Sequence, residues 1–155
     1  MAYTTINKHT DYFNTLTYTG DGTSPKTITG VGFQPDWIWG KRRDDSAGHN
    51  LYDAVRGAGN NKNIQSNGNG VEGTGLPATF GYISAFATDG FTTTEGSTDN
   101  AYWNKNTATY VTWNWKAGGG QGSSNTDGTI NTTYTSVNTT AGFSISKYTG
   151  TGSAG

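Results

Sequence analysis

Carboxylates are the side chains of this sequence most capable of chemistry, since it contains 11 Asp and Glu residues, two histidines and no cysteine. Retaining glycosidases need two carboxyl groups about 5–5.5 Å apart, which two acids on the same face of one strand would provide. Asp44 and Asp45 are consecutive and point to opposite faces of an extended chain, while Glu72 and Glu95 stand among glycines. The sequence therefore predicts no catalytic residues and no enzymatic activity.

The histidines and the remaining acids show no spacing typical of a metal or nucleophile site. His9 and His49 have no neighbouring acid or serine motif, which argues against a catalytic triad or a zinc site. Without cysteine, thiolate catalysis and disulfides are excluded. Asp21, Asp99 and Asp127 lie in predicted turns, where carboxylates and carbonyls can bind calcium. Loop calcium therefore stays open, and we expect no other cofactor.

Aromatic rings offer a second kind of chemistry, because flat rings stack on the apolar faces of sugars. Tyr102 and Trp103, beside the polar loop at residues 98–100, are the candidates for glycan binding. The competing interpretation places most Trp residues in the core, because the chain has few aliphatic side chains. We favour the core for these rings. The glycine-rich stretch 118–122 lacks the Lys-Ser/Thr pair of a phosphate loop and is interpreted as a flexible connection.

Short strands must position these residues. Residues 110–116 alternate strictly, with Val111, Trp113 and Trp115 on one face and polar residues on the other, as in a half-buried strand. The run 33–41 contains a second pair of Trp residues. We expect the two runs to be central strands whose Trp side chains form most of the core.

The fold class follows from many short strands separated by Gly, Asn and Asp turns, with no sustained helical repeat. This pattern predicts an all-β protein, either a two-sheet sandwich or a barrel, and we expect an antiparallel β-sandwich with an N-terminal arm. We divide the chain into an arm at 1–15, a sandwich at 16–147, and a linker or the start of a second module at 148–155. The Gly/Asn-rich stretch 60–75 is expected to be an exposed loop.

The arm carries four apolar side chains among polar residues: Tyr3, Ile6, Tyr12 and Phe13. These residues either pack on their own domain or dock on another subunit, because chain ends stay disordered unless something holds them. They are our candidates for assembly contacts.

Charge and hydropathy exclude two classes of partner. The formal net charge is −1 and charged residues make up 14% of the chain, so no basic field exists to bind nucleic acid. No apolar run approaches the ~20 residues of a membrane span, and the N-terminus lacks the apolar segment of a signal peptide. We expect neither nucleic-acid nor membrane partners.

Several phrases, taken together and in order, resemble a family of marine bacteriophage virion proteins with a concanavalin A-like (laminin-G-like) jelly-roll module, often found in tail fibres. The phrases are Met1–Ile6, Tyr18–Gly20, Gly32–Trp39, Asp53–Gly57, Asp89–Phe91, Trp113–Ala117 and Ala141–Ile145. The resemblance covers nearly the whole chain and implies a jelly-roll fold and a place in the virion. It brings no defined catalytic or ligand residues.

The end of the chain repeats a phrase from its beginning. Residues 148–153 are similar to residues 18–23, one domain length apart, and members of the resembled family often continue into a second module there. We therefore expect a non-enzymatic virion protein, the particle-attached N-terminal part of a tail fibre, assembled as a homotrimer with other virion proteins. The alternatives are a module that binds carbohydrate or a host receptor, and a capsid decoration protein.

Overall fold

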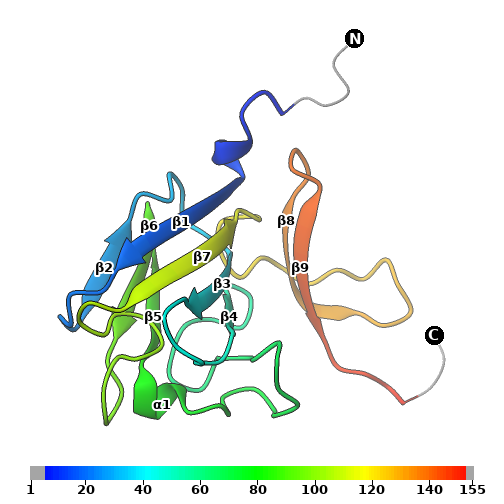
Figure 1. The fold of residues 1–155 in the computed structure, drawn as a ribbon. Coiled ribbons are helices and arrows are strands. Elements are labelled where there is room, and N and C mark those ends of the chain that lie inside the picture. Colours follow the sequence, from blue (N-terminus) through cyan, green and yellow to red (C-terminus); the bar gives the residue numbers. More distant parts are fainter. Residues whose placement is uncertain (1–5, 153–155) are drawn as a thin grey trace.

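Two antiparallel sheets form a β-sandwich in the computed structural model, which describes residues 6–152. The four-stranded sheet has the order β1-β7-β3-β4, and the three-stranded sheet has the order β2-β6-β5. A two-stranded hairpin, β8-β9, stands next to the four-stranded sheet (Figure 1). The predicted all-β, antiparallel sandwich is thus confirmed.

The strands are short, as the turn spacing predicts. Their bounds are β1 Phe13–Thr19, β2 Lys26–Thr29, β3 Trp37–Arg42, β4 Asn50–Asp53, β5 Tyr82–Ala87, β6 Gly90–Thr94, β7 Thr109–Trp115, β8 Thr132–Asn138 and β9 Phe143–Tyr148. Within residues 6–152 the helical elements are η1, His9–Asp11, and α1, Pro77–Phe80. The expected loop at 60–75 is largely exposed.

Trp103 is the centre of the core between the two sheets. Its ring meets Tyr52 and Phe91 edge-on, with centroids 5.9 and 5.8 Å apart. Ile38 and Ile83 complete the packing from opposite sheets. Trp103 comes from the turn before β7, so a loop residue fills the space between the sheets.

Gly40 in β3 makes room for this ring. A Cβ atom at Gly40 would lie 2.3 Å from a ring carbon of Trp103, far inside van der Waals contact. A glycine within a strand often marks such a close approach. The absence of a side chain at position 40 therefore lets Trp103 lie directly on the strand.

The predicted direction of the two Trp-rich strands is wrong. On β7, Tyr110, Thr112 and Asn114 face the core and are at most 1% exposed, whereas Trp113 and Trp115 are only half-buried on the outer face. Hydrogen bonds satisfy part of the polar groups on the inner face: Asn114 Nδ2 donates to the carbonyl of Asn14 (3.1 Å) and to Oγ1 of Thr112 (3.0 Å), while its Oδ1 is buried without a partner.

The expected domain boundaries shift at both ends. Residues 13–15, assigned to the arm, are the first residues of β1, and Tyr148, assigned to the following segment, is the last residue of β9. The hairpin lies within the predicted 16–147 sandwich but joins neither of its sheets.

A buried carboxylate connects the sandwich to the hairpin. Asp36 is fully buried, and its Oδ2 accepts hydrogen bonds from the backbone N–H of Ala117 (2.7 Å) and Gly119 (2.9 Å). The intervening Gly118 donates its N–H to Oγ of Ser136 in β8 (3.0 Å). The segment between β7 and β8 is thus fixed at its start, contrary to the flexible connection predicted from its glycines.

Candidate functional site

The outer face of the four-stranded sheet carries most of the tryptophan of this protein. Strand register places Phe13, Trp115 and Trp37 in one row across three strands, and Trp113 and Trp39 in the next. These five residues are here called the aromatic face. All five are half-buried.

The rings of the aromatic face hold one another in place. Trp39 and Trp113 lie 5.7 Å apart at 57°, and Trp37 and Trp115 lie 6.0 Å apart at 52°. Phe13 lies 4.8 Å from Trp115. Tilted pairs at these distances are a favoured aromatic geometry. The face is therefore a preorganised, corrugated surface, without a coplanar platform for a flat ligand.

The hairpin covers only one end of the aromatic face. Phe143 stacks on Trp115 with centroids 6.3 Å apart at 24°, and lies 5.9 Å from Trp37. A hollow of about 240 Å³ remains at this junction, lined by Trp37, Trp39, Trp115 and Phe143. Its walls are almost wholly apolar, so it suits an apolar side chain better than a sugar, which needs hydrogen-bonding partners.

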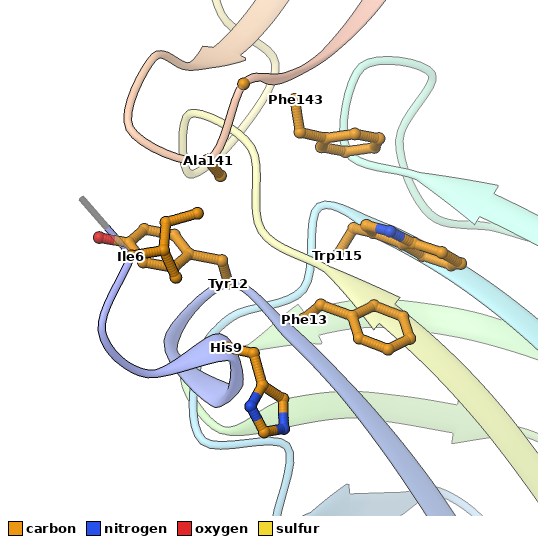
Figure 2. A pocket seen from close by; sticks show the side chains of 8 residues that line it. Ile6, His9, Tyr12, Phe13, Trp115, Ala141 and Phe143 are labelled. Atoms are coloured by element: carbon orange, nitrogen blue, oxygen red, sulfur yellow. The ribbon is translucent and has the colours of Figure 1, made fainter. Parts of the chain in front are cut away.

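A second hollow of about 290 Å³ lies on the other side of Phe143, next to the N-terminal arm (Figure 2). Its lining residues are Ile6, His9, Tyr12, Phe13, Trp115, Ala141, Gly142 and Phe143. In Figure 2 the rings of Phe143, Trp115 and Phe13 follow one another along one side, with Ile6, Tyr12 and Ala141 grouped opposite.

The structure brings three predicted assembly residues to this one hollow: Ile6, Tyr12 and Phe13. The fourth, Tyr3, lies outside the described residues. The arm thus contacts its own domain at the margin of the aromatic face, and the backbone N–H of Lys116 donates to the carbonyl of Tyr12 (2.8 Å). Whether these residues also contact another subunit stays a prediction.

His49 supports the opposite margin of the face. The indole Nε1 of Trp39 donates a hydrogen bond to Nδ1 of His49 (2.9 Å), and the two rings meet edge-on. Burial, and then the charge of Lys41, lower the pKa of His49. The imidazole therefore stays neutral at neutral pH, as acceptance of the indole hydrogen requires.

Two charged residues share the outward rows, and both are held by their own chain. Lys41 turns its ammonium to the carbonyl oxygens of Arg42 and Asp45. Asp53 is ion-paired with Arg56 through the guanidinium Nε. The five rings of the aromatic face are therefore apolar, while Lys41 keeps a positive charge at its margin and the charge of Asp53 is neutralised by Arg56.

The predicted glycan-binding role is wrong for Trp103 and is not supported as a stacking role for Tyr102. Trp103 is 1% exposed and Tyr102 is 9% exposed, because both belong to the core, as the competing interpretation held. The edge of Tyr102 does reach a polar hollow of about 390 Å³, together with Phe80, Asp99 and Lys105.

Several acidic side chains form ion pairs with basic side chains of the same chain. Asp44 and Asp45 pair with Arg42, and Glu72 lies within ion-pair distance of Lys62. Hydrogen bonds lower the pKa of Asp21; the bond from Lys26 has the largest effect, followed by those from Thr23 and then Asn104.

The three candidates for calcium each serve a different contact. Asp21 is ion-paired with Lys26, Asp99 is ion-paired with Lys105, and Asp127 accepts a hydrogen bond from Asn125. Across residues 6–152, no group of three or more His, Asp or Glu side chains could hold a metal ion together.

Sequence reasoning identified the tryptophans but missed the outward face that they form. Gly40 is the signal that could have found it. In the run Trp37-Ile38-Trp39-Gly40, a side-chain-free position on the Ile38 side indicates a bulky neighbour there, which makes that side internal and turns Trp37 and Trp39 outward.

Comparison with known proteins gives a family for this chain. The chain belongs to the family described as a domain of unknown function (DUF7483), whose model matches residues 8–155. No curated protein and no solved structure matches it. In the part of the chain that the structure describes, the helices are too short to cross a bilayer.

Proposed function

We propose that this chain is a non-enzymatic structural protein of a bacteriophage particle, best assigned to the particle-attached N-terminal part of a tail fibre. The observation that carries the proposal is the aromatic face, an outward apolar surface on a rigid sheet. Its five rings are partly exposed, and apolar side chains grouped on an outer surface are typical of an interaction site. The ordered set of phrases shared with phage virion proteins supplies the virion context.

Several features support assembly as the role of this surface. Trp and Phe are enriched at the centres of protein interfaces, where charged residues are depleted, and the aromatic face matches that composition. The N-terminal arm packs at its margin through Ile6 and Tyr12. Other virion proteins are the proposed partners, and the homotrimer usual for fibres is the proposed assembly. A capsid decoration protein would use the same surface.

The location of the chain tests this proposal. Particles of the phage that encodes it are purified, and the chain is sought by mass spectrometry and by antibody labelling in electron micrographs. We expect it in stoichiometric amounts at the tail. Labelling of the capsid would favour the decoration protein, and absence from purified particles would contradict a structural role.

A carbohydrate- or host-receptor-binding role is the second candidate, favoured by the polar hollow beside Tyr102. Phe80 and Tyr102 pack edge-on with centroids 5.6 Å apart, and the ion pair of Asp99 and Lys105 supplies hydrogen-bonding groups. An aromatic edge next to polar groups is the composition that sugar recognition uses. A glycan array with the native chain and with Asp99→Asn tests it: binding that the variant weakens supports this role, and no binding by either chain refutes it.

A further inference from the structure

The loop at residues 60–75 contains the two Asn-Gly pairs of this sequence, Asn67-Gly68 and Asn69-Gly70. Residues 66–72 are all exposed. Asparagine is among the chemically labile residues of proteins, and a following glycine makes it more so, because no side chain keeps the glycine nitrogen away from the asparagine amide. The assembly role proposed above makes no use of this loop.

We propose that Asn69 is a site of spontaneous deamidation, at which the folded chain acquires an acidic residue without an enzyme. The backbone nitrogen of Gly70 attacks Cγ of Asn69, so that a Cγ–N bond forms and the Cγ–Nδ2 bond breaks. Ammonia leaves with the proton that Gly70 gives up. Water then opens the cyclic imide: opening at Cγ gives aspartate, and opening at the backbone carbonyl carbon gives isoaspartate.

Asn69 has the freedom that this reaction requires. In the part of the chain that the structure describes, no hydrogen bond holds its side chain or the N–H of Gly70. Residues 68–71 belong to no helix, strand or turn. The amide of Asn69 can therefore rotate toward the nitrogen of Gly70 without breaking a hydrogen bond.

Asn67 is held at both of its reacting groups. Its Oδ1 accepts a hydrogen bond from the backbone N–H of His49 (3.0 Å), and the N–H of Gly68, which would attack, donates to the carbonyl of Gln65 (3.3 Å). Attack requires the amide to rotate and the nitrogen to lose its hydrogen, so both bonds must break first. We therefore expect Asn67 to react at least about tenfold more slowly than Asn69, equivalent to ~1.4 kcal/mol in the barrier.

Asn63 is the unreactive limit in the same loop. It is fully buried, and it is followed by Ile64, whose branched side chain restricts the approach of the attacking nitrogen. Asn69, Asn67 and Asn63 thus form a series from unbonded to bonded to buried, and the structure predicts that their rates follow this order.

The reaction changes the loop and leaves the strands as they are. A carboxylate at position 69 adds a negative charge to a chain whose formal net charge is −1. Isoaspartate also lengthens the backbone, because the chain then runs through the side-chain carbons. Both changes fall between β4 and α1, on a surface that water and any partner can reach.

Incubation of the purified native chain at mildly alkaline pH tests the proposal, since hydroxide removes the backbone hydrogen and accelerates attack. Cleavage after Lys62 and after Glu72 releases residues 63–72, which contain all three asparagines. Mass spectrometry of this peptide measures conversion at each position, and electron-transfer fragmentation distinguishes isoaspartate from aspartate. We expect conversion at Asn69 first, at Asn67 at least about tenfold more slowly, and none at Asn63.

Two variants and an unfolded sample are the controls. Asn69→Gln lengthens the side chain, so that attack needs a larger ring, and it should remove the early product. Asn131→Gln makes the same substitution at an exposed asparagine outside the loop and should leave the early product unchanged. In guanidinium chloride the hydrogen bonds of Asn67 and Gly68 are lost, so Asn67 should react at a rate similar to that of Asn69.

Two results would overturn the inference. One is an Asn69 that stays intact in the folded chain under conditions in which it reacts in guanidinium chloride. The other is equal conversion of Asn67 and Asn69 in the folded chain, since the hydrogen bonds would then not select the site. Neither result depends on whether the chain is in the virion, so this experiment and particle labelling fail independently.

Discussion

Asp36 is expected to control how firmly the hairpin is attached to the sandwich. Its carboxylate is fully buried at the entrance to β3 and accepts two backbone hydrogen bonds from the segment that leads to β8. Asp36→Ala removes the one oxygen that accepts both bonds and leaves the N–H groups of Ala117 and Gly119 without their partner.

The magnitude follows from these two bonds. A hydrogen bond to a charged group contributes about 1.5–3 kcal/mol, so two bonds set an upper range of about 3–6 kcal/mol. Two effects reduce the loss: a buried carboxylate carries a desolvation penalty that the variant no longer has, and Gly119 is an exposed residue, so water can replace the lost partner of its N–H. We expect a loss of about 3 kcal/mol, or roughly 6–12 °C in Tm for a chain of this length.

Urea denaturation measures the total loss, and amide hydrogen exchange locates it. Exchange should accelerate in residues 117–123 and in β8, with much less change in β2, β5 and β6. Asp36→Asn is the control, since its amide oxygen can take the place of Oδ2 and accept both bonds without the charge, and it should lose about half as much. A loss under ~1 kcal/mol for Asp36→Ala, or exchange that rises equally in both sheets, would refute the assignment of Asp36 as the anchor of the hairpin.

Three further changes test the core, the margin of the face and a strained turn. Gly40→Ala drives a Cβ to 2.3 Å from the ring of Trp103 and should destabilise by about 1–3 kcal/mol in urea, whereas Gly150→Ala, with nothing within 4 Å, should have no effect. Burial lowers the pKa of His49 in the folded chain. Near and below the ordinary histidine pKa of ~6.5 the unfolded chain therefore binds more protons than the folded chain, and stability should fall as the pH drops through that value. His49→Gln should remove this contribution to the pH dependence of the Tm. Leu76 has a left-handed φ of 66° and is 56% exposed, so Leu76→Gly should raise the free energy of unfolding by up to ~1 kcal/mol; a decrease would show that this side chain contributes to stability.

Turn chemistry and composition predicted the strands well because both are local properties. Gly, Asn and Asp mark turns by their backbone preferences. The Thr, Val and aromatic runs between them form extended strands, whichever neighbour they pack against. The predicted contact surface of the arm rests on the same kind of information, since Ile6, Tyr12 and Phe13 are the apolar residues of an otherwise polar segment. They lie together in one hollow.

The direction of the strands could not be read from their alternation. A period of two separates residues 110–116 into two faces but does not say which face is internal. The usual assumption is that the larger apolar side chains face the core. It fails here because Trp103, a loop residue, fills the space next to Gly40. Once that ring occupies the core, the strand tryptophans have no room inside.

The inverted faces also bear on the size of the internal core. Tyr110, Thr112 and Asn114 take inner positions on β7, one of the longest strands. Hydrogen bonds such as that from Asn114 to Thr112 satisfy part of their polar groups without adding much apolar burial. Trp113 and Trp115 bury part of their rings on the outer face, where they pack on other aromatic rings. Part of the apolar burial of this chain is therefore supplied by an aromatic cluster outside the space between the two sheets, so replacing Trp115, which contacts Phe13, Trp37 and Phe143, should destabilise the chain although it is not a residue of the internal core.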